Sequence, residues 1–506
     1  MEITEVPQLV RNAGRFREVV TVLAKHGLAD WLATASPDWL NRLRGEKVDR
    51  EQYSTEQRIR IAILELGTTF IKLGQVLSTR PDLVGRTLAD ELASLRANTP
   101  ADSPRSVVAM IEAELGGQVD NLFAEFDPIA MASASIGQVH RATTHCGKRV
   151  VVKVQHPGIE IRIVNDLEIM SKLAGLADQH SAYLRQFRPI QTTREFQKTL
   201  MQELDFGREL RNMIRFRENF KDDHGVRFPE PFLDLCSRRV LTMEIFEGIS
   251  ISDKEALRIS GYDLEDIARR GANLFVDMIF RDGFYHADPH PGNLMVLPGA
   301  SSTENGQTQS KNPTCENGII GVLDCGMVGR IDESLREDFE LILIASVRKD
   351  TAVITEIVAR VGEVPSDFDE STLLTSMQEF LDDYATQSID QFDLSGCLNK
   401  IVDVIRNHRI FLPSKIAMLL KVLVMLEGTA QQLSPKFSLA ELIEPYGEQA
   451  LRARFSPKKL FGRLKSTYRD WDRFFGILPK DLADILHNFK RGKFDVHLEH
   501  RRLELI

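Results

Sequence analysis

Apolar residues recur at helical spacing near the beginning of the chain. One stripe at intervals of three and four consists of Ile59, Ile63, Leu66, Phe70, Leu73 and Leu77. This spacing is typical of an amphipathic helix. Pro81 follows, and a proline does not continue a helix interior. The pattern therefore predicts one long helix that ends before Pro81, within a mainly helical region over residues 1–100.

The hydrophobic period changes further along the chain. Residues 149–155 read RVVVKVQ, a short β-branched run that predicts a buried strand with one lysine, and residues 239–246 (RVLTMEIF) predict a second strand. Helical spacing returns over 161–178 and 194–220. A small strand-rich unit followed by a larger helical unit predicts an α+β, two-lobed arrangement.

Most of the chain after Leu264 has helical spacing, except for short strands that we expect at 294–297 and 318–323. Between these strands, residues 297–318 read LPGASSTENGQTQSKNPTCENG, with few apolar side chains. Such a composition is typical of a surface loop or disordered insertion. Because compact motifs flank this segment, we predict an excursion from a β-hairpin.

Composition narrows the classes of function. The 506 residues carry a net charge of −9, which disfavours a general nucleic-acid binder because phosphates require a positive face. Five scattered cysteines, none in a CxxC pair, favour free thiols in a reducing compartment over disulfides or a zinc site. There is no signal-peptide pattern and no run of about 20 apolar residues, so no membrane span is expected.

The C-terminal tail has a different charge balance from the rest. Residues 451–506 carry 14 Lys or Arg against 7 Asp or Glu, interspersed with aromatic residues. A segment of this kind can lie on an anionic membrane surface. The alternative is a helical cap with a solvated basic face.

Two segments carry the strongest chemical signal. Residues 286–293 read HADPHPGN and place Asp288 five positions before Asn293, the spacing at which protein kinases hold a catalytic aspartate and a metal-binding asparagine. Residues 319–330 read IIGVLDCGMVGR, an apolar strand ending in Asp324, similar to the DFG element of kinases with Cys325 in place of phenylalanine. Since Mg²⁺ takes oxygen ligands, Asn293 and Asp324 are its predicted ligands. Taken alone, the first segment is also compatible with a turn that has a capping aspartate.

Upstream, Lys153 lies inside the first predicted strand. A buried lysine needs a partner, which a nucleotide phosphate or a glutamate would supply, whereas an edge-strand lysine facing solvent would need none. Residues 131–140 (MASASIGQVH) are small and polar and contain one glycine, Gly137. Small side chains let backbone N–H groups approach phosphates, and Ser133 and Ser135 add hydroxyl groups. The sequence contains no Walker A motif and no GxGxxG.

Together these segments resemble the UbiB family of atypical protein-kinase-like proteins. Two further segments match that family: FIKLGQ at 70–75 carries its KxGQ signature, and ELDFGRELRN at 203–212 matches its acidic ExD segment. The resemblance covers roughly residues 55–430, with the motifs in family order. It implies a two-lobed protein-kinase-like fold with a helical N-terminal KxGQ extension and a basic helical tail. The implied divisions are residues 1–100, 101–247, 248–440 and 441–506.

The resemblance also implies roles for individual residues. Asp288 would be the catalytic base, with Asn293 and Asp324 as metal ligands. Lys153 would contact nucleotide phosphates and pair with Glu209, and Lys72 would pair with Glu203 over the site. Gln75 would help to fill the position that corresponds to the site at which a peptide substrate enters other kinases. The remaining nucleotide-binding positions are Ala132, Ser133, Ala134, Ser135 and Gly137 in the alanine-rich loop and Glu244 and Phe246 at the hinge.

The activity that the resemblance implies is an atypical kinase or ATPase that binds ATP or ADP with Mg²⁺. It would support ubiquinone (coenzyme Q) or related quinone biosynthesis at the cytoplasmic face of the inner membrane. A lipid or quinone precursor, quinone-biosynthesis enzymes and an anionic membrane surface are the implied partners. Many family members end in transmembrane helices, whereas this chain shows none. Two other hypotheses stay open at this stage: a small-molecule phosphotransferase of the choline or aminoglycoside kinase type, and a non-catalytic pseudokinase scaffold.

Overall fold

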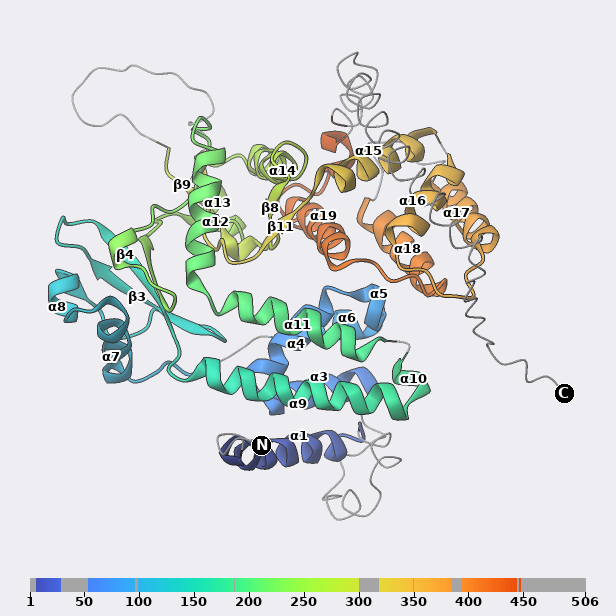
Figure 1. Cartoon of the computed structure of the whole chain (residues 1–506). Coiled ribbons are helices and arrows are strands. Elements are labelled where there is room, and N and C mark those ends of the chain that lie inside the picture. Colours follow the sequence, from blue (N-terminus) through green and yellow to red (C-terminus); the bar gives the residue numbers. More distant parts are fainter. Residues whose placement is uncertain are drawn as a thin grey trace, which may run out of the picture. The chain divides into compact units, whose positions relative to one another are not determined.

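A computed structural model describes residues 6–28, 53–95, 99–185, 187–299, 318–348, 350–384, 394–443 and 446 (Figure 1). Contacts divide the chain into two units, Met1–Ile443 and Glu444–Ile506, and the description below concerns the first. The basic tail at 451–506 lies outside the described residues, so its membrane-facing interpretation stays a prediction. The four-part domain division likewise stays a prediction.

The chain begins with a group of helices. They are α1 (Val6–Lys25), α3 (Thr55–Leu66), α4 (Thr68–Ser78), α5 (Pro81–Val84) and α6 (Arg86–Ala93). The prediction of a single long helix before Pro81 is wrong, because Gly67 separates α3 from α4. Gly67 has φ +88°, a left-handed conformation that glycine adopts without steric cost. The residues of the KxGQ signature therefore lie on a separate short helix, α4.

An antiparallel sheet follows. Its strands are β1 (Glu125–Phe126), β2 (Ala132–Ser133), β3 (Gly137–Thr143), β4 (Arg149–Gln155) and β6 (Val240–Glu244), in the order β1-β3-β4-β6 with β2 paired to β3. Both predicted strands are confirmed. Helices α7 (Pro104–Leu115) and α8 (Val119–Leu122) complete the lobe, and Val107, Ile111 and Phe123 pack with the buried valines of β4.

Helices lie between β4 and β6 along the chain. They are α9 (Ile159–His180), α10 (Ala182–Arg185), α11 (Pro189–Glu203) and α12 (Phe206–Asn219). The helix predicted at 161–178 is confirmed. The helical spacing predicted at 194–220 corresponds to two helices, because α11 ends before Leu204 and the Asp205 carboxylate then accepts a hydrogen bond from the Gly207 N–H to cap α12.

The second lobe has a small sheet, two short strands beside it, and helices. The sheet has the order β5-β10-β9-β7. These elements are β5 (Val226–Arg227), β7 (Ile249–Ser250), α13 (Lys254–Ile259), α14 (Leu264–Phe280), β8 (Phe284–His286), η3 (Pro291–Asn293), β9 (Leu294–Leu297), β10 (Ile319–Val322) and β11 (Val328–Arg330). The short helix η2 (Leu233–Leu235) instead packs through Leu235 on the core of the first lobe. Leu297 lies opposite Ile319 in an antiparallel pair, which confirms the hairpin predicted around residues 297–318. Sequence reasoning missed β8 and β11, each only three residues long.

The lobe ends in five helices. They are α15 (Glu333–Arg348), α16 (Thr351–Val361), α17 (Glu370–Tyr384), α18 (Leu394–Asn407) and α19 (Ser414–Leu433). Of the helices that the structure describes, α19 is the one long and apolar enough to cross a membrane by length and composition. More than half of its apolar window is buried, and it packs against α14. In this fold α19 is a core helix.

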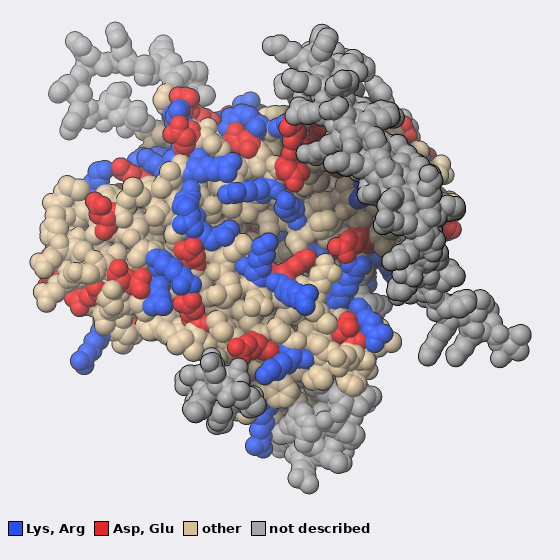
Figure 2. All heavy atoms as spheres, in the orientation of Figure 1, with Lys and Arg blue, Asp and Glu red and all other residues tan. Residues whose placement is uncertain are grey.

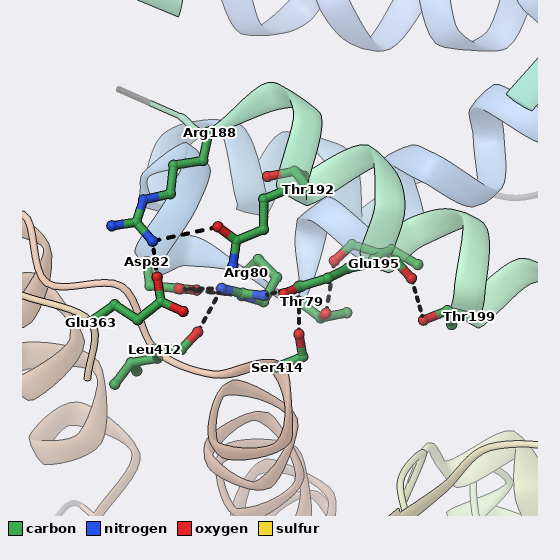
Figure 3. Close-up of polar contacts among 12 residues, drawn as sticks. Thr79, Arg80, Asp82, Arg188, Thr192, Glu195, Thr199, Glu363, Leu412 and Ser414 are labelled. Carbon is green, nitrogen blue, oxygen red and sulfur yellow. Dashed lines mark hydrogen bonds and ion pairs between the residues drawn. The ribbon is translucent and has the colours of Figure 1, made fainter. Parts of the chain in front are cut away.

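A buried arginine joins the N-terminal helices to both lobes (Figure 3). Arg80, between α4 and α5, makes an ion pair of 2.8 Å with Asp82 and reaches Glu195 on α11 at 3.3 Å. Its Nη2 also donates to the Leu412 carbonyl, 3.0 Å away, immediately before α19. Glu195 accepts a further hydrogen bond from Ser414. One polar cluster therefore joins the segment of α4 and α5 to α11 and to the beginning of α19.

The outer surface carries both signs of charge, with Lys and Arg beside Asp and Glu over the face shown in Figure 2. Exposed ion pairs among the described residues include Lys148–Glu230 at 2.9 Å and Lys221–Glu218 at 2.7 Å. Solvent screens such pairs, so each contributes only about 0–1 kcal/mol.

Candidate functional site

The strand lysine lies between two carboxylates from distant parts of the chain. Lys153 Nζ on β4 lies 2.8 Å from Glu209 Oε2 on α12 and 3.9 Å from Asp324 Oδ2, just after β10. The Glu209 side chain is 5% exposed and that of Asp324 is 50% exposed. The alternative of a solvent-facing edge lysine is wrong, because β4 lies between β3 and β6 and the amine is paired.

These three groups shift one another's protonation. Burial opposes the charge on Lys153, but Asp324 and Glu209 outweigh it and raise the pKa of the amine above its ordinary value. Lys153 lowers the pKa of Asp324 to about 2. Burial raises the pKa of Glu209 to about 7, despite the opposing effect of Lys153. One amine therefore neutralises two carboxylates only in part, and Asp324 stays ionised at the half-exposed edge of the group.

The predicted catalytic loop is a tight turn after β8. Asn293 Nδ2 donates to Asp288 Oδ2 at 2.9 Å and to the Asp288 carbonyl at 3.2 Å. Within the same turn, the His290 side chain accepts the N–H of Gly292. Asp288 and Asn293 are thus brought together as the spacing implied. Their assignment as base and metal ligand stays a prediction.

Sequence reasoning missed two residues that contact the segment containing Asp324. His286 Nδ1 accepts the Asp288 N–H at 3.2 Å, which leaves its Nε2–H to donate to the Asp324 carbonyl. Asn212 on α12 donates to the Cys325 carbonyl at 3.0 Å. Both residues are buried. His286 begins the HADPHPGN segment and Asn212 ends ELDFGRELRN, so each lay within a recognised segment whose tertiary contacts were unknown.

The residues of the KxGQ helix reach different surroundings. Lys72 Nζ lies 2.8 Å from Glu203 Oε2 at the end of α11, and the charge of Lys72 helps Lys153 to lower the pKa of Asp324. Gln75 Nε2 donates to the Leu95 carbonyl at 3.1 Å, after α6. The Lys72–Glu203 pair is present as predicted. The regulatory roles of Lys72, Glu203 and Gln75 stay predictions.

The alanine-rich loop is partly strand. Ala132 and Ser133 form β2, Ala134 is exposed, and Ser135 is buried. Gly137 is the first residue of β3, where an added Cβ would lie 2.4 Å from a β4 backbone oxygen. Close strand approach therefore explains the glycine. The nucleotide-binding role assigned to these five residues stays a prediction.

The two predicted hinge residues lie where the sheets of the two lobes adjoin. The Glu244 carboxylate pairs with Arg227 of β5 and accepts the Glu230 N–H at 3.3 Å. An added Cβ on Gly321 of β10 would lie 2.9 Å from the Phe246 ring. Contact of Glu244 and Phe246 with adenine stays a prediction.

A lysine from α19 adds a positive charge near the catalytic loop. Burial lowers the pKa of Lys421, Asp288 opposes this effect and Lys72 adds to it. The helix is held to the loop by Thr429, whose hydroxyl donates to the Pro289 carbonyl at 3.1 Å. From the sequence, Lys421 was visible only as an interruption of an apolar run.

Two family models match parts of this chain. The family model of the ABC1 atypical kinase-like domain matches residues 94–358, and that of the UbiB helical domain matches 377–438. The chain belongs to the UbiB family. Relatives named "Probable protein kinase UbiB" include one from Actinobacillus pleuropneumoniae, 31% identical over 96% of this chain and 88% of its own length. Another, from Pseudomonas putida, is 32% identical over 86% of this chain and 78% of its own length. The fold is accordingly that of a UbiB atypical kinase, as predicted.

Solved structures with some similarity include a Mycobacterium tuberculosis protein in complex with erythromycin and a Rio2 kinase from Chaetomium thermophilum in an ADP/Mg²⁺-phosphoaspartate complex. The first is 23% identical, with a TM-score of 0.48, over 73% of this chain and 90% of that one. The second is 12% identical, with a TM-score of 0.23, over 72% and 99%. The UbiB assignment rests on the family models and the relatives.

Proposed function

We propose that this UbiB protein binds ATP or ADP with Mg²⁺ and hydrolyses ATP or transfers its γ-phosphoryl group. The observation that carries the proposal is the convergence of Lys153, Glu209 and Asp324 beside a turn that holds Asp288 and Asn293. His286 contacts both parts, because it bonds the backbone of Asp288 and that of Asp324. This combination of amine, carboxylates and amide suits phosphoryl transfer, in which positioning and charge stabilisation dominate.

The donor set fits a magnesium ion. Asp324 is an ionised, half-exposed carboxylate and Asn293 has an amide oxygen, and Mg²⁺ prefers such oxygen ligands. In the described part of the chain, Glu209 Oε1 and Ser133 Oγ are buried without a hydrogen-bond partner. The carboxylate oxygen can accept a hydrogen bond from a bound group, and the hydroxyl group can accept or donate one. When bound, Mg²⁺ would offset negative charge on the nucleotide phosphates.

The protein's own residues would divide the remaining work. Lys153, oriented by Glu209, would contact the phosphates, and the alanine-rich loop would line the phosphate side. Asp288, held by the Asn293 amide, would accept the proton of the attacking water or hydroxyl group. Glu244 and Phe246 would lie against the adenine of the nucleotide.

We further propose that the protein supports the biosynthesis of ubiquinone or a related quinone at the cytoplasmic face of the inner membrane. The name of the relatives supports this role. A lipid or quinone precursor, or an enzyme of that biosynthesis, would be the partner, and the basic residues at 451–506 would favour an anionic surface. Lys72 and Glu203 would regulate the access of nucleotide to the site.

Phosphate release by the purified protein with MgATP tests the proposal. Asp288→Asn should lower turnover at least about 100-fold, the usual contribution of a general base. Asp234→Asn, which removes an exposed carboxylate on η2, should leave turnover unchanged. Full activity in Asp288→Asn would overturn the assignment of the base.

A melting experiment separates an enzyme from a non-catalytic scaffold. A nucleotide that binds the folded state raises Tm by mass action whether or not chemistry follows. Stabilisation by MgADP without phosphate release would favour the scaffold. The absence of any nucleotide effect on Tm or turnover would refute the proposed nucleotide site itself. ATP-dependent phosphorylation of simple alcohols would favour a small-molecule phosphotransferase.

A further inference from the structure

One histidine holds the turn of the alanine-rich loop at two points. The backbone N–H of His156, just after β4, donates to the Ile136 carbonyl at 2.9 Å. The ring Nε2 of the same residue lies 2.8 Å from the Ala134 carbonyl. Within the same turn, the Ala134 N–H donates a hydrogen bond to the Gly137 carbonyl at 2.9 Å. His156 thus contributes two of these three hydrogen bonds to the turn.

The other ring nitrogen of His156 faces a carboxylate. Nδ1 lies 2.6 Å from Asp102 Oδ2, a residue just before α7. A carboxylate oxygen and a carbonyl oxygen are both acceptors, so each must receive an N–H. Both hydrogen bonds therefore form together only when the imidazole carries both protons, and loss of one proton removes one of the two bonds.

A second histidine in the same network needs only one proton. Gln138 Nε2 donates to His140 Nε2 at 2.8 Å, and His140 Nδ1 donates to the Asp127 carbonyl at 2.9 Å. Burial lowers the pKa of His140, in agreement with a neutral ring. Gln138 Oε1 accepts a hydrogen bond from the Asp102 N–H at 2.7 Å. This bond holds the backbone of Asp102, the residue whose carboxylate faces His156.

The surroundings of the His156 ring make the contact specific. In the part of the chain that the structure describes, Asp102 is the charged group that forms an ion pair with this ring. The ring is buried and the Asp102 side chain is 28% exposed, so the pair is partly shielded from water. Charge-assisted hydrogen bonds of this kind are roughly twice as strong as neutral ones.

We propose that His156 and Asp102 are positioning residues that clamp the alanine-rich loop in the conformation that binds nucleotide. The inference rests on the proposed function, because the loop is taken to line the phosphates. The His156 ring holds the Ala134 carbonyl through Nε2, and Asp102 holds the ring through Nδ1. Without this clamp the loop samples other conformations, and apparent affinity falls in proportion to the population that remains competent.

The test is the affinity for MgADP, measured by calorimetry at one pH for all the proteins compared. His156→Gln should bind about tenfold more weakly than the wild type, if about one tenth of its molecules keep the loop in place. Turnover at saturating MgATP should stay close to that of the wild type, because the clamp does not touch the reacting groups. A general loss of structure would lower both affinity and turnover.

Two further variants sharpen the result. Asp102→Asn keeps an acceptor for Nδ1 but replaces a charge-assisted hydrogen bond with a neutral one, so its affinity should lie between those of the wild type and His156→Gln. His145→Gln is the matched control, because His145 is an exposed histidine at the turn between β3 and β4. Its affinity should match the wild type. Melting curves show whether the three variants are folded.

Failure of this inference differs from failure of the proposed function. If wild type binds MgADP and His156→Gln gives the same affinity, the clamp is refuted while the nucleotide site stands. If wild type fails to bind MgADP, the proposed function is refuted. An unfolded His156→Gln would leave Asp102→Asn to decide, because wild-type affinity in that variant contradicts the clamp.

Discussion

Replacement of Arg80 by leucine would remove the cation that joins the KxGQ-bearing helices to both lobes. Its guanidinium makes two hydrogen bonds to Asp82 of 2.8 and 2.9 Å and reaches the Leu412 carbonyl, 332 residues away along the chain. The side chains of Arg80 and Asp82 are 9% and 2% exposed. The variant would therefore leave a buried carboxylate without its cation.

The magnitude follows from this burial. Breaking a buried pair by removing one partner costs about 3–5 kcal/mol, because an uncompensated charge remains. At about 2.1 cal/mol/K per residue, the unfolding entropy of a unit of roughly 440 residues is about 0.9 kcal/mol/K. The expected fall in Tm is therefore about 3–6 °C. The double variant Arg80→Leu/Asp82→Leu removes the stranded charge as well and should recover most of that loss.

Thermal unfolding monitored by circular dichroism measures the effect, and Arg86→Leu is the matched control. Arg86 lies on the neighbouring helix α6 and also pairs with the last helices, at 3.8 Å from Asp403, but both side chains are well exposed. Its loss should cost about 0–1 kcal/mol. Equal melting of Arg80→Leu and Arg86→Leu, or no recovery in the double variant, would refute the argument that burial makes the Arg80 pair strong.

Three further predictions concern other parts of the fold. Gly137→Ala should lower stability by about 1–3 kcal/mol, measured by thermal melting, because the new methyl group would overlap the β4 backbone. Cys146 should be alkylated by iodoacetamide fastest among the cysteines that the structure describes, because it is exposed and its Thr144 hydrogen bond lowers the pKa of the thiol, which increases the thiolate fraction at a given pH. Thr144→Val should slow that reaction. Lys72→Met should lower the Mg²⁺ concentration needed for half-maximal turnover several-fold, because it removes a positive charge that repels the cation. Glu203→Gln should raise that concentration, because it removes a negative charge that attracts the cation.

Each of these predictions has a control. Gly175→Ala meets no atom within 4 Å of the added Cβ and should not destabilise, so equal losses at both glycines would contradict the overlap. Cys397 is buried, and alkylation of Cys397 as fast as that of Cys146 would contradict the role of exposure. Lys198→Met, on the exposed surface of α11, should leave the Mg²⁺ requirement unchanged. A shift of the same sign in Lys72→Met and Glu203→Gln would contradict the electrostatic account.

Local chemistry made several parts of the fold predictable from the sequence. The β-branched run gave β4 with its bounds, and the polar segment at 297–318 gave the hairpin of β9 and β10. The spacing of Asp288 and Asn293 placed both on one turn. These features depend on residues close together in the chain, where covalent connection limits the arrangements. Long helical spacing was less reliable, because Gly67 and the Leu204–Asp205 step interrupt helices whose apolar pattern continues.

The sequence by itself determined which residue types were available for the site and how short segments fold. The tertiary structure decided which of them meet: His286 with the Asp324 backbone, His156 with Asp102, and Arg80 with residues before α19. Such contacts join segments up to hundreds of residues apart. Their geometry depends on how strands pair and helices pack, which no local spacing specifies. Charge and hydrogen bonding fall steeply with distance, so the properties of these groups were settled only when folding brought them together.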